Sequence, residues 1–349
     1  MKNFCAKSAL HMSRRTAQRG MSLMELMVGL AIGVVLTLGM FTMIVSTSQS
    51  FRMNDDFSRM QENAATAFRY LGDSLRQAGF YGNGQDATSM SIPGGSPVTT
   101  TTDCGSAANW SRGTMQDFAL DFATPIRAYM NYTPLTVHAD FPCIQQVNFA
   151  TGPAGMANPN PILVTRICWA IVAAGAANAS PACSGTVSLL TNQNNYATSI
   201  YVQADPYNGI AFYGADYAAL RASPTALKYS NGIDMEMFEY RAHVYYVRPC
   251  SRPAGGATNC TGANDDDGHP IPTLVRQELP LVEGIEFIDY RFGIDTTGGD
   301  GVADTYVGNI LNIPDWAQVV SVKVTLLVRS PGINNEYDDS AKQYDLLGD

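Results

Sequence analysis

The sequence is poor in charge and lacks the residue patterns that most enzymes use. Only 15% of its 349 residues are charged, against about 25% in typical globular proteins. After residue 20 the histidines are His138, His243 and His269, and none of them lies in an HExxH pattern. The sequence also has no GxSxG nucleophile turn and no phosphate-binding glycine loop. We therefore expect no catalytic function.

Positive charge is scarce outside the first 20 residues. Residues 1–20 contain five basic residues and no acid, so the net charge of −9 for the whole chain leaves −14 for the remainder. Binding to nucleic acid through phosphates is not indicated for so acidic a body. A short basic leader before an apolar segment fits the positive-inside rule instead.

No two cysteines have CxxC spacing, which argues against a zinc site. Cys5 lies in the leader, and the body contains Cys104, Cys143, Cys168, Cys183, Cys250 and Cys260. Six cysteines in an exported body predict up to three disulfides. Neighbours in sequence favour the pairs Cys104–Cys143, Cys168–Cys183 and Cys250–Cys260, the last two more strongly. Buried free thiols are the alternative.

Proline is absent between residues 21 and 92, and charge is absent from Leu26 to Val45. Twenty apolar residues in a helix span roughly 30 Å, which is the thickness of a bilayer core. A cleaved secretory signal ending near Ser46–Ser48 is the alternative. Its apolar region would be shorter, and Glu25 at the start of the run argues against it.

The helical pattern continues beyond the apolar run. Apolar residues recur at spacings of three and four: Met53, Phe57, Met60, Ala64, Phe68, Leu71, Leu75 and Ala78. This spacing predicts one apolar stripe on an amphipathic helix, and Gly79 and Gly82 supply a stop. We expect a basic leader over 1–20 and one long helix over 21–80, which crosses the membrane at 26–45.

Residues 81–349 are expected to form a β-rich globular head with long loops. Residues 83–160 are rich in small and polar residues, and short strands are predicted near 116–122 and 161–173. Three further β-like runs are Met235–Val247, Leu281–Phe292 and Ala317–Arg329. The fold class is therefore α+β, with the helix stripe packed on one face of an antiparallel sheet.

Two acidic loops are candidates for metal sites. Asp295, Asp300 and Asp304 lie in a loop similar to calcium-binding sequences, although the spacing is one residue too long. We weigh a calcium site against a plain Asp/Gly turn, and no other cofactor is expected. Residues 264–268 (NDDDG) predict a solvated hairpin tip. His243 is expected to be structural, and Phe238, Tyr245 and Tyr246 to be core residues.

The position of Glu25 is unusual, because a charge at the mouth of an apolar run is unfavourable unless it is paired. Gly29 and Gly33 form a small-xxx-small pair that permits close helix approach. The run from Arg19 to Val28 (RGMSLMELMV) resembles the type III signal of type IV prepilins. The resemblance implies cleavage between Gly20 and Met21 by a prepilin peptidase and N-methylation of Met21. It also implies that Glu25 pairs with the amine of a neighbouring subunit.

Further residues indicate which kind of prepilin the chain resembles. Met21 replaces the usual phenylalanine, and Thr42 occupies the place of a kinking proline in major pilins, which indicates a minor pilin. Residues 281–295 and 319–329 resemble PilW-type minor pilins, which help to prime and assemble type IV pili in Gram-negative bacteria. Where such chains often end in a basic strand, residues 334–349 form a polar tail.

The resemblance also implies partners and a location. The partners would be the prepilin peptidase, other minor pilins, the major pilin and the inner-membrane assembly platform. The protein would be a single-pass inner-membrane protein with a periplasmic head, and later part of the pilus at the cell surface. A minor pseudopilin of a type II secretion system shares the same signal and is the nearest alternative. An exported, membrane-anchored adhesin or calcium-binding module is an alternative of another class.

Overall fold

The computed structural model divides the chain into two compact units, residues 1–55 and residues 56–349. Each unit is described by itself below. The described residues are 20, 22–82, 90–91, 124–130, 144, 149–150, 160–169, 200–213, 216, 219–220, 222, 228, 235, 237–277, 279–297 and 299–330. The strand predicted near 116–122 lies outside them.

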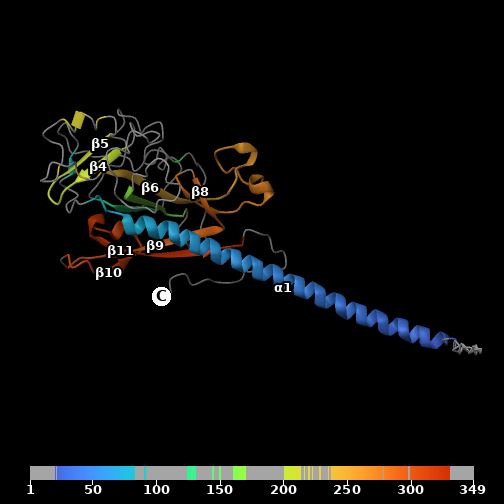
Figure 1. The fold of residues 1–349 in the computed structure, drawn as a ribbon. Coiled ribbons are helices and arrows are strands. Elements are labelled where there is room, and N and C mark those ends of the chain that lie inside the picture. Colours follow the sequence, from blue (N-terminus) through green and yellow to red (C-terminus); the bar gives the residue numbers. More distant parts are fainter. Residues whose placement is uncertain are drawn as a thin grey trace, which may run out of the picture. The chain divides into compact units, whose positions relative to one another are not determined.

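A single helix, α1, extends from Leu23 to Gln77 (Figure 1). It contains 55 residues, and no proline removes a backbone donor within it. The helix ends before Gly79, whose φ of 80° lies in the left-handed region that glycine favours. The N–H of Gly79 donates to the carbonyl of Arg166, which ties the end of α1 to a strand. The helix lies within the predicted range of 21–80.

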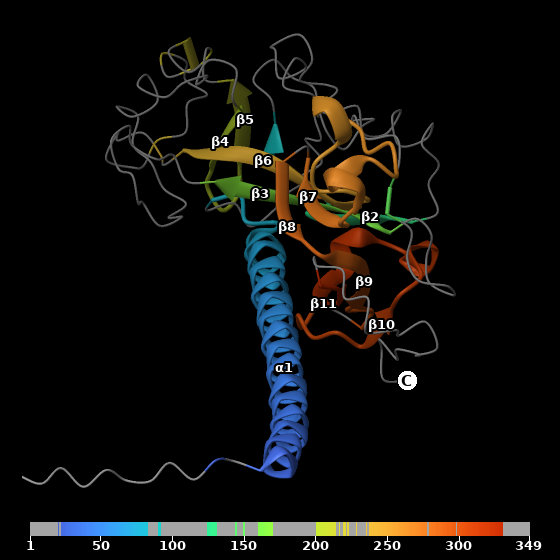
Figure 2. The same cartoon turned by 90° about the vertical axis from the view of Figure 1, so that its right-hand side faces the viewer.

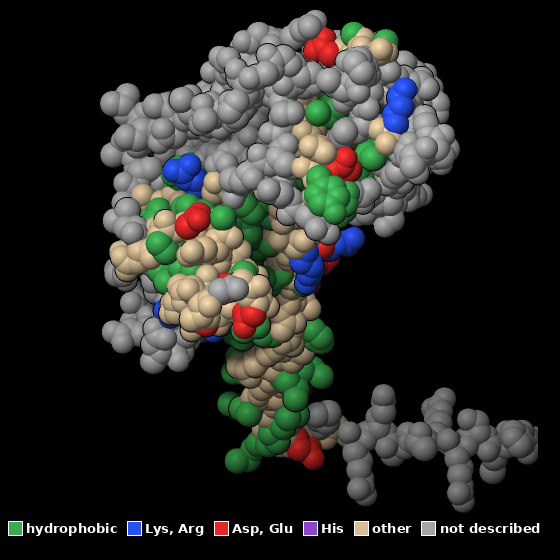
Figure 3. Space-filling view, turned by 90° about the vertical axis from the view of Figure 1, so that its left-hand side faces the viewer, with side chains coloured by type: hydrophobic (Ala, Val, Ile, Leu, Met, Phe, Trp, Pro, Cys, Tyr) green, Lys and Arg blue, Asp and Glu red, His purple; other side chains and the backbone are tan. Residues whose placement is uncertain are grey.

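In the first unit, the apolar side chains of α1 are exposed over the whole predicted membrane segment. Figure 3 shows green hydrophobic side chains around this part of the helix. Its few hydroxyls bond within the helix: Thr37 donates to the carbonyl of Gly33, and Thr42 donates to that of Gly39. Such internal pairing is required in hydrocarbon, where no water is available. This stretch is long and apolar enough to cross a membrane.

The second unit contains a large, mostly antiparallel sheet (Figure 2). Its strands are β1 (Met90–Ser91), β2 (Ile126–Tyr129), β3 (Ile162–Trp169), β4 (Ile200–Ala204), β5 (Gly209–Tyr213), β6 (Phe238–Arg248), β7 (Thr273–Arg276) and β8 (Leu279–Glu283). Their order is β1-β5-β4-β6-β3-β2, and β7 pairs with β6 and β8. The β1–β5 pair is parallel, unlike the other strand pairs in the described residues. The predicted runs at 161–173 and 235–247 correspond to β3 and β6.

The predicted α+β class with antiparallel strands is confirmed, and the strands form two sheets, of which the second has three strands in the order β10-β9-β11. The strands are β9 (Ile285–Ile294), β10 (Thr305–Val307) and β11 (Val319–Val328). The predicted strand 281–292 is divided between β8 and β9 at Gly284. Gly284 has a φ of 80°, and a Cβ there would lie 2.6 Å from the carbonyl oxygen of Arg329. Glycine therefore permits the turn that sends the chain from one sheet to the other.

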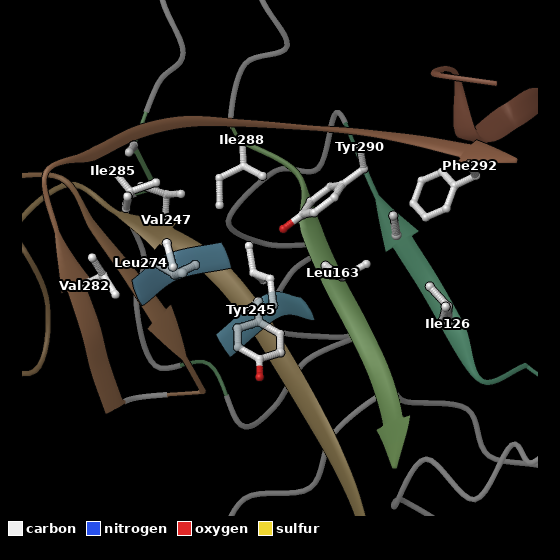
Figure 4. Packing of buried hydrophobic residues seen from close by; sticks show 14 of the residues in the cluster. Ile126, Leu163, Tyr245, Val247, Leu274, Val282, Ile285, Ile288, Tyr290 and Phe292 are labelled. Atoms are coloured by element: carbon white, nitrogen blue, oxygen red, sulfur yellow. The ribbon is translucent and has the colours of Figure 1, made fainter. Parts of the chain in front are cut away.

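The main core lies between the inner faces of the two sheets and includes α1 residues from the second unit. Figure 4 shows Ile288 and Tyr290 of β9 directed toward Tyr245 of β6 and Leu163 of β3. Ala67 and Leu71 are the buried apolar residues that α1 adds.

The predicted stripe of α1 was wrong in part. Phe57 and Phe68 are 56% and 45% exposed, whereas Ala67 is fully buried. The packed face is therefore rotated toward small residues, which allow α1 to approach the sheets closely.

Candidate functional site

Two hydrogen bonds to side-chain acceptors cap the N-terminus of α1. The Oγ of Ser22 accepts from the N–H of Met24 at 3.3 Å, and Oε2 of Glu25 accepts from the N–H of Ser22 at 3.3 Å. This is a capping box, in which two side chains satisfy backbone donors that the first turn leaves open. The S-x-x-E spacing before an apolar run is a sequence pattern that indicates such a cap.

The predicted cleavage and assembly residues lie next to this cap. Gly20 is exposed, and nothing lies within 4 Å of the position that a Cβ would take. Glu25 belongs to the first turn of α1. Met21 lies outside the described residues. Cleavage after Gly20 and N-methylation of Met21 therefore stay predictions.

The apolar side chains that follow are an open packing surface. Gly29 and Gly33 have no neighbouring atoms within 4 Å of an ideal Cβ. Both lie on the apolar part of α1, so another helix could approach its backbone there. The structure thus leaves this predicted small-xxx-small pair available for contact.

One of the predicted disulfides is confirmed. Cys250 and Cys260 are bonded and enclose a short loop with a separation of ten residues. The same cysteines and Asp265 lie close enough to hold a metal, but a disulfide leaves no thiolate to serve as a ligand. The predicted pairs Cys104–Cys143 and Cys168–Cys183 involve side chains outside the described residues.

Two buried carboxylates organise the disulfide loop, so the prediction of a solvated tip over 264–268 was wrong. Asp265 is fully buried and accepts from the N–H groups of Ala254, Thr261 and Gly262, each at 2.7 Å. Burial raises the pKa of the Asp265 carboxyl, but these hydrogen bonds outweigh it and leave the pKa below its ordinary value. The ionised carboxylate of Asp265 therefore holds the disulfide loop together by accepting hydrogen bonds from its backbone.

The second buried carboxylate, that of Asp266, connects the backbone before the disulfide loop with the backbone after it. Asp266 accepts from the N–H groups of Ser251 at 2.8 Å, Arg252 at 2.6 Å and Ile271 at 2.9 Å. Its φ of 49° is left-handed, a conformation that aspartate tolerates better than most residues. The sequence reasoning missed both carboxylates, because consecutive acids usually indicate a solvated turn.

The predicted calcium residues are used by the loop itself. Asp295 accepts from the N–H groups of Gly299 and Gly301, at 3.3 and 3.0 Å. Asp304 accepts from the backbone and hydroxyl of both Thr296 and Thr297.

The Thr296 N–H and the two threonine hydroxyls lower the pKa of Asp304. Asp300 is bonded to the N–H of Val302. The three carboxylates thus stabilise a turn, and calcium binding stays a prediction.

A buried polar cluster connects α1 to the large sheet. Within the second unit, the hydroxyl of Ser74 lies 3.1 Å from Nδ1 of His243 and 2.5 Å from the hydroxyl of Tyr245. Burial, with smaller effects from Arg276 and Arg241, lowers the pKa of His243 to about 3. His243 is therefore neutral at physiological pH and has the structural role that the sequence predicted. Tyr245, Tyr246 and Phe238 are buried as expected.

Comparison with known families was informative for two parts of the chain. Residues 15–41 match the prokaryotic N-terminal methylation motif, and residues 244–349 match the Type IV Pilus-assembly protein W family. Comparisons with curated proteins and with solved structures gave no significant match. The first match contains Gly20, Met21 and Glu25, and the second contains the disulfide loop and the three-stranded sheet. The two matches and the α+β fold show that the chain is a PilW-like type IV prepilin, a minor pilin of the type IV pilus.

Proposed function

We propose that this minor pilin helps to initiate and assemble type IV pili after a prepilin peptidase cuts between Gly20 and Met21. The observation that carries the proposal is the position of Glu25. It is the one acid in the first turn of an unbroken helix whose following residues are apolar and exposed. The basic leader keeps the cut on the cytoplasmic side, and the helix holds the protein in the membrane until assembly.

Cleavage creates the group that Glu25 needs. The new amine of Met21, once methylated, carries a positive charge at the edge of the apolar segment. In the uncut chain, Glu25 is bonded to an exposed backbone N–H at 3.3 Å, a contact that is easily exchanged. We infer that on assembly Glu25 pairs with the Met21 amine of a neighbouring subunit. In low dielectric this attraction is strong, so it sets one axial register while apolar contacts supply adhesion.

The proposed partners are the prepilin peptidase, other minor pilins, the major pilin and the inner-membrane assembly platform. The proposed location is the inner membrane, with residues 81–349 in the periplasm, followed by the pilus at the cell surface. The Cys250–Cys260 disulfide supports this location, because structural disulfides persist in oxidising compartments. The proposed role is structural, without a catalytic step.

Deletion of the gene and complementation with the full chain test the initiation role. We expect deletion to reduce the number of pili per cell, whereas the length of the remaining pili stays unchanged. A defect in initiation alters how many filaments start, and a defect in elongation shortens them. If piliation is normal and secretion of type II substrates is lost, the pseudopilin alternative is correct and this proposal is wrong.

A further inference from the structure

Ser22 is the residue at which the helical backbone of α1 begins. The helix starts at Leu23, and the carbonyl of Ser22 accepts the first bond of the helical ladder, from the N–H of Leu26 at 3.1 Å. The Oγ of Ser22 accepts from the N–H of Met24 at 3.3 Å. These two properties define an N-cap residue. The start of α1 is therefore fixed by the backbone and the side chain of Ser22 together.

Glu25 completes the cap from inside the helix. Its Oε2 accepts from the N–H of Ser22 at 3.3 Å, so the N–H, the carbonyl and the side chain of Ser22 all take part in the cap. Serine at the N-cap with glutamate three residues later is a favoured combination at the start of a helix. Both side chains thus favour the same starting position for α1.

The sequence offers few other positions at which α1 can begin. Serine, threonine, aspartate, asparagine and glycine are the residues that cap helices well. After Ser22 the next of these residues is Gly29, and before it the nearest is Gly20. A start at Gly29 would leave backbone groups unpaired within the apolar segment, which is unfavourable in a membrane. Without the Ser22 hydroxyl, the best remaining start is therefore Gly20.

A start at Gly20 would change the bond that the peptidase is proposed to cut. As the N-cap, Gly20 would have its carbonyl engaged in the first hydrogen bond of the helix. That carbonyl belongs to the Gly20–Met21 peptide, and it is the group at which hydrolysis takes place. Proteolysis is favoured where the backbone is exposed and outside regular structure. A start at Ser22 keeps this peptide outside α1.

We propose that Ser22 is a positioning residue for cleavage: by capping α1, it keeps the Gly20–Met21 peptide outside the helix and available to the prepilin peptidase. This role rests on the proposed function, because it is a role in the cleavage step. Glu25 contributes to it as half of the cap, without need of its charge. Its pairing with a neighbouring subunit follows cleavage, so the same side chain serves the two steps in turn.

Variants of Ser22 separate the cap from the shape of the side chain. Ser22→Asn is as good a cap as serine, whereas Ser22→Thr and Ser22→Val are a matched pair in which valine replaces the hydroxyl by a methyl group. Pulse-chase labelling in cells that carry the prepilin peptidase measures how fast each full-length chain is cut.

We expect Ser22→Val to be cut at least about twofold more slowly than the wild-type protein, because a lost cap shifts the equilibrium between two helix starts by roughly fivefold. Ser22→Asn should be cut at the wild-type rate, and Ser22→Thr faster than Ser22→Val. Glu25→Gln keeps the cap and should also be cut at the wild-type rate.

Limited digestion with trypsin tests the start of the helix without the peptidase. Trypsin cuts after Arg19 and also binds the residues that follow the cut, so a helix that begins at Gly20 hinders it. Mass spectrometry of the full chain in detergent micelles should show slower cutting after Arg19 in Ser22→Val than in Ser22→Asn. Cutting after Lys228, which is exposed, should be equal in the two variants.

The outcomes distinguish the cap from its alternatives. Equal cleavage of the wild-type protein and Ser22→Val by the peptidase would overturn the positioning role, and so would slow cleavage of Ser22→Asn. Slow peptidase cleavage of Ser22→Val with an unchanged trypsin rate would show that the peptidase reads Ser22 directly, which would overturn the capping role. A wild-type chain that stays uncut would instead show that the proposed function is wrong.

Discussion

Glu25 accepts a hydrogen bond from the backbone N–H of Ser22 at 3.3 Å. In the uncut chain, this carboxylate at the edge of the apolar segment therefore helps to cap α1. The contact separates two roles of Glu25, because glutamine can also complete a capping box. Capping alone does not need a charge, whereas pairing with the Met21 amine of a neighbour does.

The first prediction uses this separation. We expect Glu25→Gln and Glu25→Ala both to be cut after Gly20, and both to be incorporated into pili at least about tenfold less, since a lost ion pair in low dielectric exceeds 1.4 kcal/mol. Immunoblots of sheared pili and of whole cells measure incorporation and total protein. If Glu25→Gln were incorporated into pili as well as the wild-type protein, the pairing role would be wrong and only the capping role of Glu25 would remain.

The second prediction concerns Asp265 in the disulfide loop. Asp265→Asn should destabilise the second unit by about 1–3 kcal/mol, because a neutral acceptor replaces a buried, multiply hydrogen-bonded carboxylate. Asp267→Asn is the matched control, since its side chain is 91% exposed. Urea unfolding followed by tyrosine fluorescence compares the two. Equal midpoints for both variants would contradict the role of Asp265.

The third prediction concerns the disulfide itself. The double variant Cys250→Ala and Cys260→Ala removes a constraint on a loop with a separation of ten residues. Loop-closure entropy for a loop of this size corresponds to about 3 kcal/mol of stability. We expect a lower urea midpoint in the variant, and a similar loss when the wild-type protein is reduced. An unchanged midpoint in both cases would show that hydrogen bonds alone hold the loop.

The fourth prediction is a pH dependence that originates at His243. Its pKa is about 3 when folded and near 6.5 when unfolded, so the unfolded state binds the extra proton between these values. Stability from this group is complete above pH 6.5 and falls as the pH drops toward 3, by at most about 1.4 kcal/mol per unit. Wild-type protein should lose more stability between pH 7 and pH 5 than His243→Gln. If stability fell equally with pH in the two proteins, His243 would not be the origin of the pH dependence.

The long helix α1 was predictable because its signals are local. An apolar run without proline determines α1, and the S-x-x-E pattern could have predicted its cap as well. The packed face of α1 was not predictable from periodicity, because apolar residues occur on more than one side of the helix. Ser74 is buried where its hydrogen-bond partners are His243 and Tyr245, which lie 169 and 171 positions away in sequence.

The errors in the head arose from contacts that form only in the folded chain. Gly284 breaks an apparently continuous strand because the carbonyl of Arg329 approaches it closely. Asp265 and Asp266 resembled a solvated turn, and only the folded loop brings backbone donors from 251 to 271 around them. A single sequence contains no local signal for either arrangement.

The central claim is tested most directly by mass spectrometry of the mature N-terminus, using protein extracted from membranes of cells that carry the prepilin peptidase. We predict a chain that begins at Met21 with a methylated amine, and an uncut chain in cells that lack the peptidase. A chain that starts at Met1 in both strains, or one that starts after Ser48, would contradict the account.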